Sequence, residues 1–307
     1  MIPVVMYIGS FQRNPLPISL KVNNQAVKIH QKEIALGRLR FHCLVAGDEQ
    51  DSLVVLLHGF PETSHMWRPL MKDLVSAGYY CLAPNMRGYS ENACPKGKKN
   101  YRIELLVRDV LDLAAAVGKS KFHLIAHDWG AVIGWYLAYD HPEILVSYTS
   151  LSVPHLKGFY KAIGKDKDQQ YRSRYIKKLL VPFIAEYAIR KNDFEAFRKL
   201  WKFSSKEELK NYLEVFRKRK ILTAALNYYR ANLGKSQRKE IGEIRVPVLF
   251  IWGNKDMAIG PYGVSEGHQY CKGGYKFLEL NAGHWLIQTM YDDIKQAVLD
   301  HLEHLGQ

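Results

Sequence analysis

The chain has 307 residues, of which 47% are apolar, so its length and composition exclude a disordered chain and allow one large domain with an insertion or two small domains. The formal net charge is +14, but no groove-reading motif accompanies it, so we do not expect nucleic-acid binding. No run of eighteen apolar residues occurs and the start, MIPVVMYIG, lacks a basic leader, which predicts a soluble, cytoplasmic protein without a membrane span.

The chain divides into an arm, a core in two parts and an insertion. The proline-containing residues 1–28 are expected to form an amino-terminal arm. Residues 29–156 and 241–307 contain short apolar runs of the kind that form strands, and we assign both to one core. Residues 157–240 lack such runs and have apolar residues at three- and four-residue steps, which predicts an inserted helical layer.

The predicted core is an α/β fold. Six runs of four to eight residues, each bounded by turn residues, read in chain order SLVVLLHGF, YYCLAP, FHLIAH, LVSYTSL, VPVLFIWG and YKFLEL. Their continuous hydrophobicity is typical of strands that are covered on both faces, and helical stretches lie between them. Right-handed crossovers then give a mostly parallel sheet with helices on both sides. Active residues of such sheets gather just after the strands.

The run FHLIA is followed by His127-Asp128-Trp129-Gly130. Small residues on both sides of Asp128 allow a sharp strand-to-helix turn that lifts the central side chain above the sheet, so Asp128 takes the position of a nucleophile. The alternative is that Asp128 only caps the following helix.

Two further strand ends complete a catalytic set. Asp256 follows VPVLFIWG and His284 follows YKFLEL. The chain order is therefore nucleophile, acid, histidine, as in enzymes that carry their nucleophile on a strand-to-helix turn. The alternative for Asp256 is a loop Asx-turn. After SLVVLL, the backbone N–H of Phe60 is predicted to form a two-donor oxyanion hole with that of Trp129. The remaining candidates are expected to line a pocket beneath the helical layer, with packing in the core as the alternative for most of them and a structural role as the alternative for His58: His58, Pro61, Trp67, Phe159 and Trp285.

With HGFPETSHMW, APNMRGYS, AHDWG, WGNKD and AGHWL, the chain from about Ile29 to its end resembles an α/β-hydrolase of the epoxide hydrolase family. The resemblance implies an α/β-hydrolase core with an inserted all-helical cap at 157–240. It also implies two cap tyrosines that hold the epoxide oxygen, at Tyr229 and Tyr175, with Tyr171 as a substitute for the latter. The implied reaction gives a diol through an ester on Asp128, with His284 as base.

The implied partners are an epoxide and water, with no cofactor, and a homodimer is left open. A haloalkane or haloacid dehalogenase is the nearest alternative, because it uses the same nucleophile with N–H donors such as the Trp129 indole for the halide. A non-catalytic ligand-binding member of the fold is the second alternative.

The net charge is concentrated in one segment. Residues 157–240 contain 23 Lys and Arg against 9 Asp and Glu, whereas the rest of the chain contains 21 of each. The excess predicts either recognition of anionic substrates or an acidic surface, or a solvated helical surface without a specific partner. The four cysteines show no CxxC pair or metal-ligand spacing, which predicts reduced thiols and no metal site: Cys43, Cys81, Cys94 and Cys271.

Overall fold

The computed structural model describes residues 27–233 and 240–304, so the predicted arm lies outside the described residues except for Val27 and Lys28. One sheet contains eight strands in the order β1-β2-β4-β3-β5-β6-β7-β8. The strands are β1 His30–Leu36, β2 Leu39–Ala46, β3 Ser52–Leu57, β4 Tyr79–Pro84, β5 Phe122–His127, β6 Leu145–Leu151, β7 Val248–Gly253 and β8 Tyr275–Leu280. Strands β3 to β8 are parallel and correspond to the six predicted runs.

Strands β1 and β2 form an antiparallel hairpin at one edge of the sheet that the sequence analysis did not predict. Leu36 pairs with Leu39, so the loop consists of Gly37 and Arg38, and Gly37 has a φ of 59°. A two-residue hairpin loop needs positive φ values, which glycine adopts without steric cost. Strand β1 mixes polar and apolar residues, HQKEIAL, because it is an edge strand with most of its side chains in solvent.

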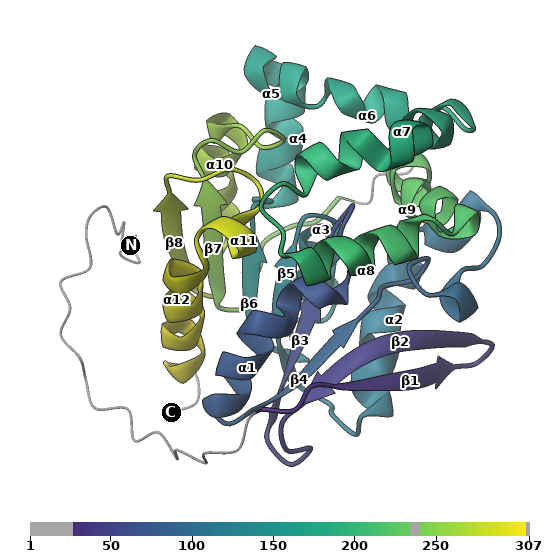
Figure 1. The fold of residues 1–307 in the computed structure, drawn as a ribbon. Coiled ribbons are helices and arrows are strands. Elements are labelled where there is room, and N and C mark those ends of the chain that lie inside the picture. The colour runs from purple at the N-terminus through teal and green to yellow at the C-terminus, as the bar shows by residue number, and fades with distance from the viewer. Residues whose placement is uncertain (1–26, 234–239, 305–307) are drawn as a thin grey trace.

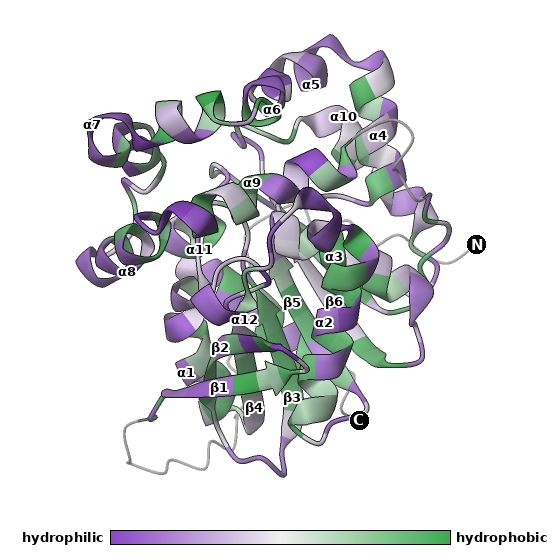
Figure 2. Cartoon of the chain, turned by 90° about the vertical axis from the view of Figure 1, so that its right-hand side faces the viewer, coloured by the Kyte–Doolittle hydropathy of each residue, from purple (hydrophilic) through white to green (hydrophobic). Residues whose placement is uncertain are grey.

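Helices cover both faces of the sheet. Figure 1 shows α1 (Arg68–Ser76) and α12 (Tyr291–Glu303) on one face, and α2 (Ile103–Ala116) and α3 (Trp129–Asp140) on the other. Strands β5 and β7 are therefore buried along their whole length, as their continuous apolar sequences predict. Figure 2 shows β5 and β6 mainly in the colour of hydrophobic residues, and hydrophilic residues on β1 and on the outer helices. The core thus fixes the strand ends from which the loops project.

Within the described residues, six α-helices lie between β6 and β7 in the chain, and they cover the carboxyl ends of the strands (Figure 1). They are α4 Leu156–Lys165, α5 Lys167–Arg172, α6 Arg174–Leu179, α7 Ile184–Leu200, α8 Lys206–Phe216 and α9 Arg219–Asn232. We call them the helical layer. The remaining helices are α10 Pro261–Gly267 and α11 Leu286–Thr289. Within residues 27–233 and 240–304, no helix combines the length and apolar character needed to cross a bilayer.

Candidate active site

Asp128 occupies a sharp turn between β5 and α3. Its backbone has φ 50° and ψ −117°, a conformation that L-residues rarely adopt. A Cβ at Gly130 would lie 2.3 Å from the carbonyl oxygen of Leu57, so only glycine allows α3 to start this close to β3. The side chain of Asp128 makes no capping hydrogen bond to α3, in contrast to the capping alternative. The turn instead holds the carboxylate above the end of the sheet.

The loop after β3 approaches this carboxylate. The backbone N–H of Phe60 donates a 2.8 Å hydrogen bond to Oδ1 of Asp128. A Cβ at Gly59 would lie 2.4 Å from Cβ of Asp128, so the absence of a side chain at Gly59 permits the approach. The Phe60–Pro61 peptide bond is cis. Trp129, whose N–H is the second predicted donor, is the first residue of α3.

His284 stands between two aspartates. Its Nδ1 lies 2.8 Å from Oδ2 of Asp256, and its Nε2 lies 3.7 Å from Oδ2 of Asp128. Burial alone would lower the pKa of His284, but the negative charges of Asp256, Asp128 and Glu62 outweigh it and raise the pKa to about 9. His284 is thus poised to hold a proton while both aspartates are charged.

Asp256 is fully buried after β7. Its Oδ1 accepts hydrogen bonds from the N–H groups of Ala258 at 2.7 Å and Ile259 at 3.1 Å, so the predicted Asx-turn geometry coexists with the contact to His284. Burial acts to raise the pKa of Asp256, but His284 and the hydrogen bonds lower it below its usual value. The carboxylate therefore stays ionised inside the protein.

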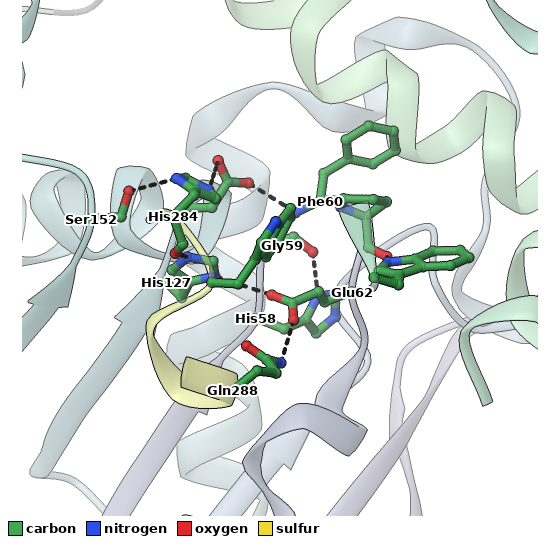
Figure 3. Close-up of polar contacts among 12 residues, drawn as sticks. His58, Gly59, Phe60, Glu62, His127, Ser152, His284 and Gln288 are labelled. Atoms are coloured by element: carbon green, nitrogen blue, oxygen red, sulfur yellow. Dashed lines mark hydrogen bonds and ion pairs between the residues drawn. The ribbon is translucent and has the colours of Figure 1, made fainter. Parts of the chain in front are cut away.

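Ser152, which follows β6, joins this site although the sequence pattern did not predict it. Its hydroxyl lies 2.9 Å from Nδ1 of His284 (Figure 3) and 2.7 Å from Oδ2 of Asp256. Ser152 adopts a φ of 74°, so the chain bends sharply at this strand end. The hydroxyl donates to the Asp256 oxygen that faces the imidazole and helps to fix its position.

A second buried pair, Glu62 and His127, was also missed. Oε2 of Glu62 lies 3.2 Å from Nδ1 of His127, and Nε2 of His127 donates to the backbone carbonyl of His284 at 3.0 Å. Gln288 donates to Oε1 of Glu62 at 2.7 Å (Figure 3). His127 therefore lies between the carboxylate of Glu62 and the backbone of His284. The hydrogen bond from His127 holds the backbone of His284 in place.

A cavity opens beside Asp128, between the core and the helical layer. Its apolar wall includes Val132, Val153, Leu156, Phe159, Ile176 and Ile259. Both predicted tyrosines, Tyr175 on α6 and Tyr229 on α9, line this cavity. Burial raises the pKa of both phenols, and the charge of Asp128 raises it further, so both stay protonated.

Tyr171, the substitute for Tyr175, lies elsewhere. It is 65% exposed, its ring stacks on Arg174 at 4.0 Å, and it is not among the residues that line the cavity.

Of the five predicted pocket residues, only Phe159 lines the cavity. His58 is fully buried, with one ring nitrogen bonded to the carbonyl of Gly59 and the other accepting from the N–H of Met86. Burial lowers the pKa of His58 to about 4. His58 is therefore a neutral structural residue.

Trp67, Trp285 and Pro61 pack against other residues and do not line the cavity. Trp67 is fully buried beside the start of α1. The ring of Trp285 packs edge-on against that of His284, with centroids 4.9 Å apart. The carbonyl of Pro61 accepts a 3.0 Å hydrogen bond from the Trp201 indole. Aromatic identity in the sequence did not tell core from cavity.

Comparisons with known proteins give a consistent result. A family model described as the alpha/beta hydrolase fold matches residues 52–289. The AB hydrolase superfamily protein YfhM of Bacillus subtilis is 32% identical over 86% of this chain and 95% of its own length. Epoxide hydrolase 3 of Xenopus tropicalis is 30% identical over 86% of this chain and 75% of its own length. The crystal structure of a Bacillus megaterium epoxide hydrolase with an inhibitor superposes with a TM-score of 0.81 at 26% identity, covering 89% of this chain and 100% of that one.

Proposed function

The chain belongs to the epoxide hydrolase family of α/β hydrolases, and from this membership we propose that it hydrolyses epoxides to vicinal diols through a covalent ester on Asp128. One observation carries the proposal: the carboxylate of Asp128, at the turn after β5, and two tyrosines, Tyr175 and Tyr229, line the same cavity. The carboxylate can attack the electrophilic ring carbon of an epoxide, and the phenols can donate hydrogen bonds to its ring oxygen. Residues 157–240 then serve as the cap that closes the site.

The first step opens the ring. An ordinary aspartate, with a pKa of about 3.9, is ionised at neutral pH and attacks a strained ring carbon without a general base. We assign the attack to Oδ2 of Asp128, because Oδ1 already accepts from Phe60. The new bond joins this oxygen to carbon while the ring C–O bond breaks. A proton from Tyr175 or Tyr229 neutralises the departing oxygen, as general acids do.

The second step hydrolyses the ester. Esterification removes the charge of Asp128, which is one of the charges that raise the pKa of His284, so the imidazole releases its proton more easily and becomes a base. Neutral His284, oriented by Asp256, takes a proton from a water that attacks the ester carbonyl. The oxyanion forms on Oδ1, against the N–H groups of Phe60 and Trp129. Loss of one such donor typically costs about 10²–10³ in rate.

Collapse of the oxyanion breaks the bond between the carbonyl carbon and the diol oxygen, which takes the proton from His284 and leaves, and the new carboxyl of Asp128 then returns its proton to the imidazole. The proton that His284 released before this step replaces the one that the phenol gave up.

The indole donors weigh against the dehalogenase alternative. A halide needs N–H donors that point into the cavity. The indole of Trp201, at the end of α7, donates to the carbonyl of Pro61, and the ring of Trp129 packs edge-on against that of Tyr229 with centroids 5.1 Å apart. The complete set of Asp128, Asp256 and His284 weighs against a non-catalytic binder.

A trapped ester tests the proposal. The variant His284→Gln is mixed with styrene oxide, and the intact protein and its peptides are weighed. We expect an adduct with the mass of the epoxide on the peptide that contains Asp128, because ring opening needs no base whereas ester hydrolysis does. The double variant Asp128→Ala, His284→Gln is the control and should carry no adduct.

Two other outcomes point elsewhere. An alkyl adduct from a haloacid or haloalkane, without one from several epoxides, would support the dehalogenase. Absence of any adduct would favour the non-catalytic binder.

A further inference from the structure

Exposed apolar side chains gather on one part of the helical layer. Ten large hydrophobic residues are exposed in the part of the chain that the structure describes, and five of them lie between the end of α6 and the first turns of α7. We call these five the apolar ridge: Leu180, Val181, Phe183, Ile184 and Tyr187. Phe183 is 86% exposed, and Tyr187 is 73% exposed. Contiguous exposed apolar residues of this kind mark interaction sites.

The ridge is a built feature of the fold. Phe183 and Tyr187 are four residues apart at the start of α7, where the N–H of Tyr187 donates to the carbonyl of Phe183, so both lie on one side of this turn. Ala185 and Ile189 on the same helix are buried, so α7 keeps a separate inward face. Phe183 has a φ of 64°, an unfavourable value for a bulky residue, yet its side chain points into solvent. Figure 1 and Figure 2 both place α6 and α7 at the edge of the molecule away from the sheet.

Positive charge surrounds the ridge. Residues 171–191 contain six Lys and Arg and a single acid, Glu186, which pairs with Arg230 at 2.8 Å. Arg174, Lys177 and Lys178 are exposed on α6, just before the ridge, and form no ion pair with any residue that the structure describes. The apolar residues are therefore bordered by uncompensated cations.

We propose that the apolar ridge docks on an anionic lipid surface. Apolar side chains that enter the headgroup region, bordered by Lys and Arg that face anionic headgroups, are the combination that holds a protein on such a surface. A second copy of this chain fits less well, because a ridge-to-ridge contact would bring two sets of like charges together. The docking goes beyond the proposed function and does not depend on it.

The ridge adjoins the cavity through α6. Tyr175 and Ile176 on this helix line the cavity, and the ridge begins four residues after Ile176. Docking would therefore bring the α6 wall of the cavity close to the lipid. An apolar ligand dissolved in the lipid would then have a short path to the cavity.

Vesicle flotation tests the proposal. The full chain is mixed with vesicles of phosphatidylcholine, with and without phosphatidylserine, and the floating fraction is measured. We expect binding only to the anionic vesicles and a loss of about tenfold or more in the double variant Phe183→Ser, Ile184→Ser. Phe203→Ser removes an exposed aromatic residue of the same layer outside the ridge and should bind like the unmodified protein.

Two double variants with the same change in net charge distinguish binding through the cations beside the ridge from a general effect of net charge. The variant Lys177→Glu, Lys178→Glu should lose about tenfold in binding to anionic vesicles. The variant Lys206→Glu, Lys210→Glu changes the net charge equally on exposed positions of α8 and should lose far less. Circular dichroism and thermal unfolding check that each variant is folded.

Three results would overturn the proposal. The first is that the unmodified protein fails to float with anionic vesicles. The second is that the ridge variant and the control variants float equally well. Alternatively, sedimentation shows a lipid-free dimer that Phe183→Ser, Ile184→Ser converts to a monomer, which makes the ridge a contact between copies. None of these readouts involves epoxide hydrolysis, so a failure here is distinct from a failure of the proposed function.

Discussion

The backbone N–H of Phe60 donates a 2.8 Å hydrogen bond to Oδ1 of Asp128, although the two residues are 68 positions apart in the chain. The contact joins the ends of β3 and β5, which are neighbours in the sheet. It gives the two oxygens of one carboxylate different surroundings before any substrate binds. The proposed chemistry depends on this difference.

Gly59 makes that contact possible, so Gly59→Ala should disturb it. The new Cβ would lie 2.4 Å from Cβ of Asp128, and the two loops must separate. We expect a loss of about 1–3 kcal/mol in the free energy of unfolding and a much slower hydrolysis of the ester. Denaturant unfolding and single-turnover kinetics measure both. Gly164→Ala is the control, because nothing lies within 4 Å of a Cβ there.

Asp256→Asn should separate the two chemical steps. The charge of Asp256 raises the pKa of His284 and orients its ring, so its loss should slow ester hydrolysis by on the order of 10⁴. Ring opening does not use His284, and rapid mixing should still show a burst of bound product. A variant without any burst would mean that Asp256 also supports the first step.

Tyr229→Phe removes one phenol from the cavity without changing the ring. Alkylation by an epoxide should become slower by on the order of 10². Tyr228→Phe is the matched control, because the Tyr228 hydroxyl donates to the carbonyl of Arg87 and Tyr228 is not among the residues that line the cavity. It should lower stability by about 1 kcal/mol and leave the alkylation rate unchanged. Equal rates for Tyr229→Phe and the unmodified protein would argue against the phenols as acids.

Stability should depend on pH through His284. Its pKa is raised from 6.5 to about 9 in the folded protein, so between these values the folded state holds a proton that the unfolded chain releases. The contribution is complete below about pH 6.5 and disappears as the pH rises through about 9. Denaturant unfolding across this window should show a smaller decline for His284→Gln. Identical slopes in both proteins would contradict the raised pKa.

Continuous apolar runs made the parallel part of the fold predictable. Strands covered on both faces, such as β5 and β7, have sequences that few other structures explain. The hairpin of β1 and β2 was not predicted, because an edge strand exposes polar side chains and HQKEIAL has no continuous run of apolar residues. The signal for it was the short turn at Gly37.

The positions of Asp128, Asp256 and His284 could be predicted because each follows a strand, and parallel strands end at one edge. Ser152 also follows a strand, but a serine there is common and carries no distinct signal. Glu62 is an acidic residue, a type that is rarely buried, so its inward position depends on contacts that sequence does not show.

The two oxygens of Asp128 have different surroundings, and on the proposed route one of them is transferred to the product. On the proposed route, the oxygen added to each diol comes from the carboxylate, and the oxygen of water stays in the protein. The first diol formed in oxygen-18 water would therefore be unlabelled. If Oδ1 stays against Phe60 throughout, the second diol receives the isotope in full rather than by half, because only the renewed oxygen attacks. The product of one cycle thus carries a record of the solvent in the cycle before.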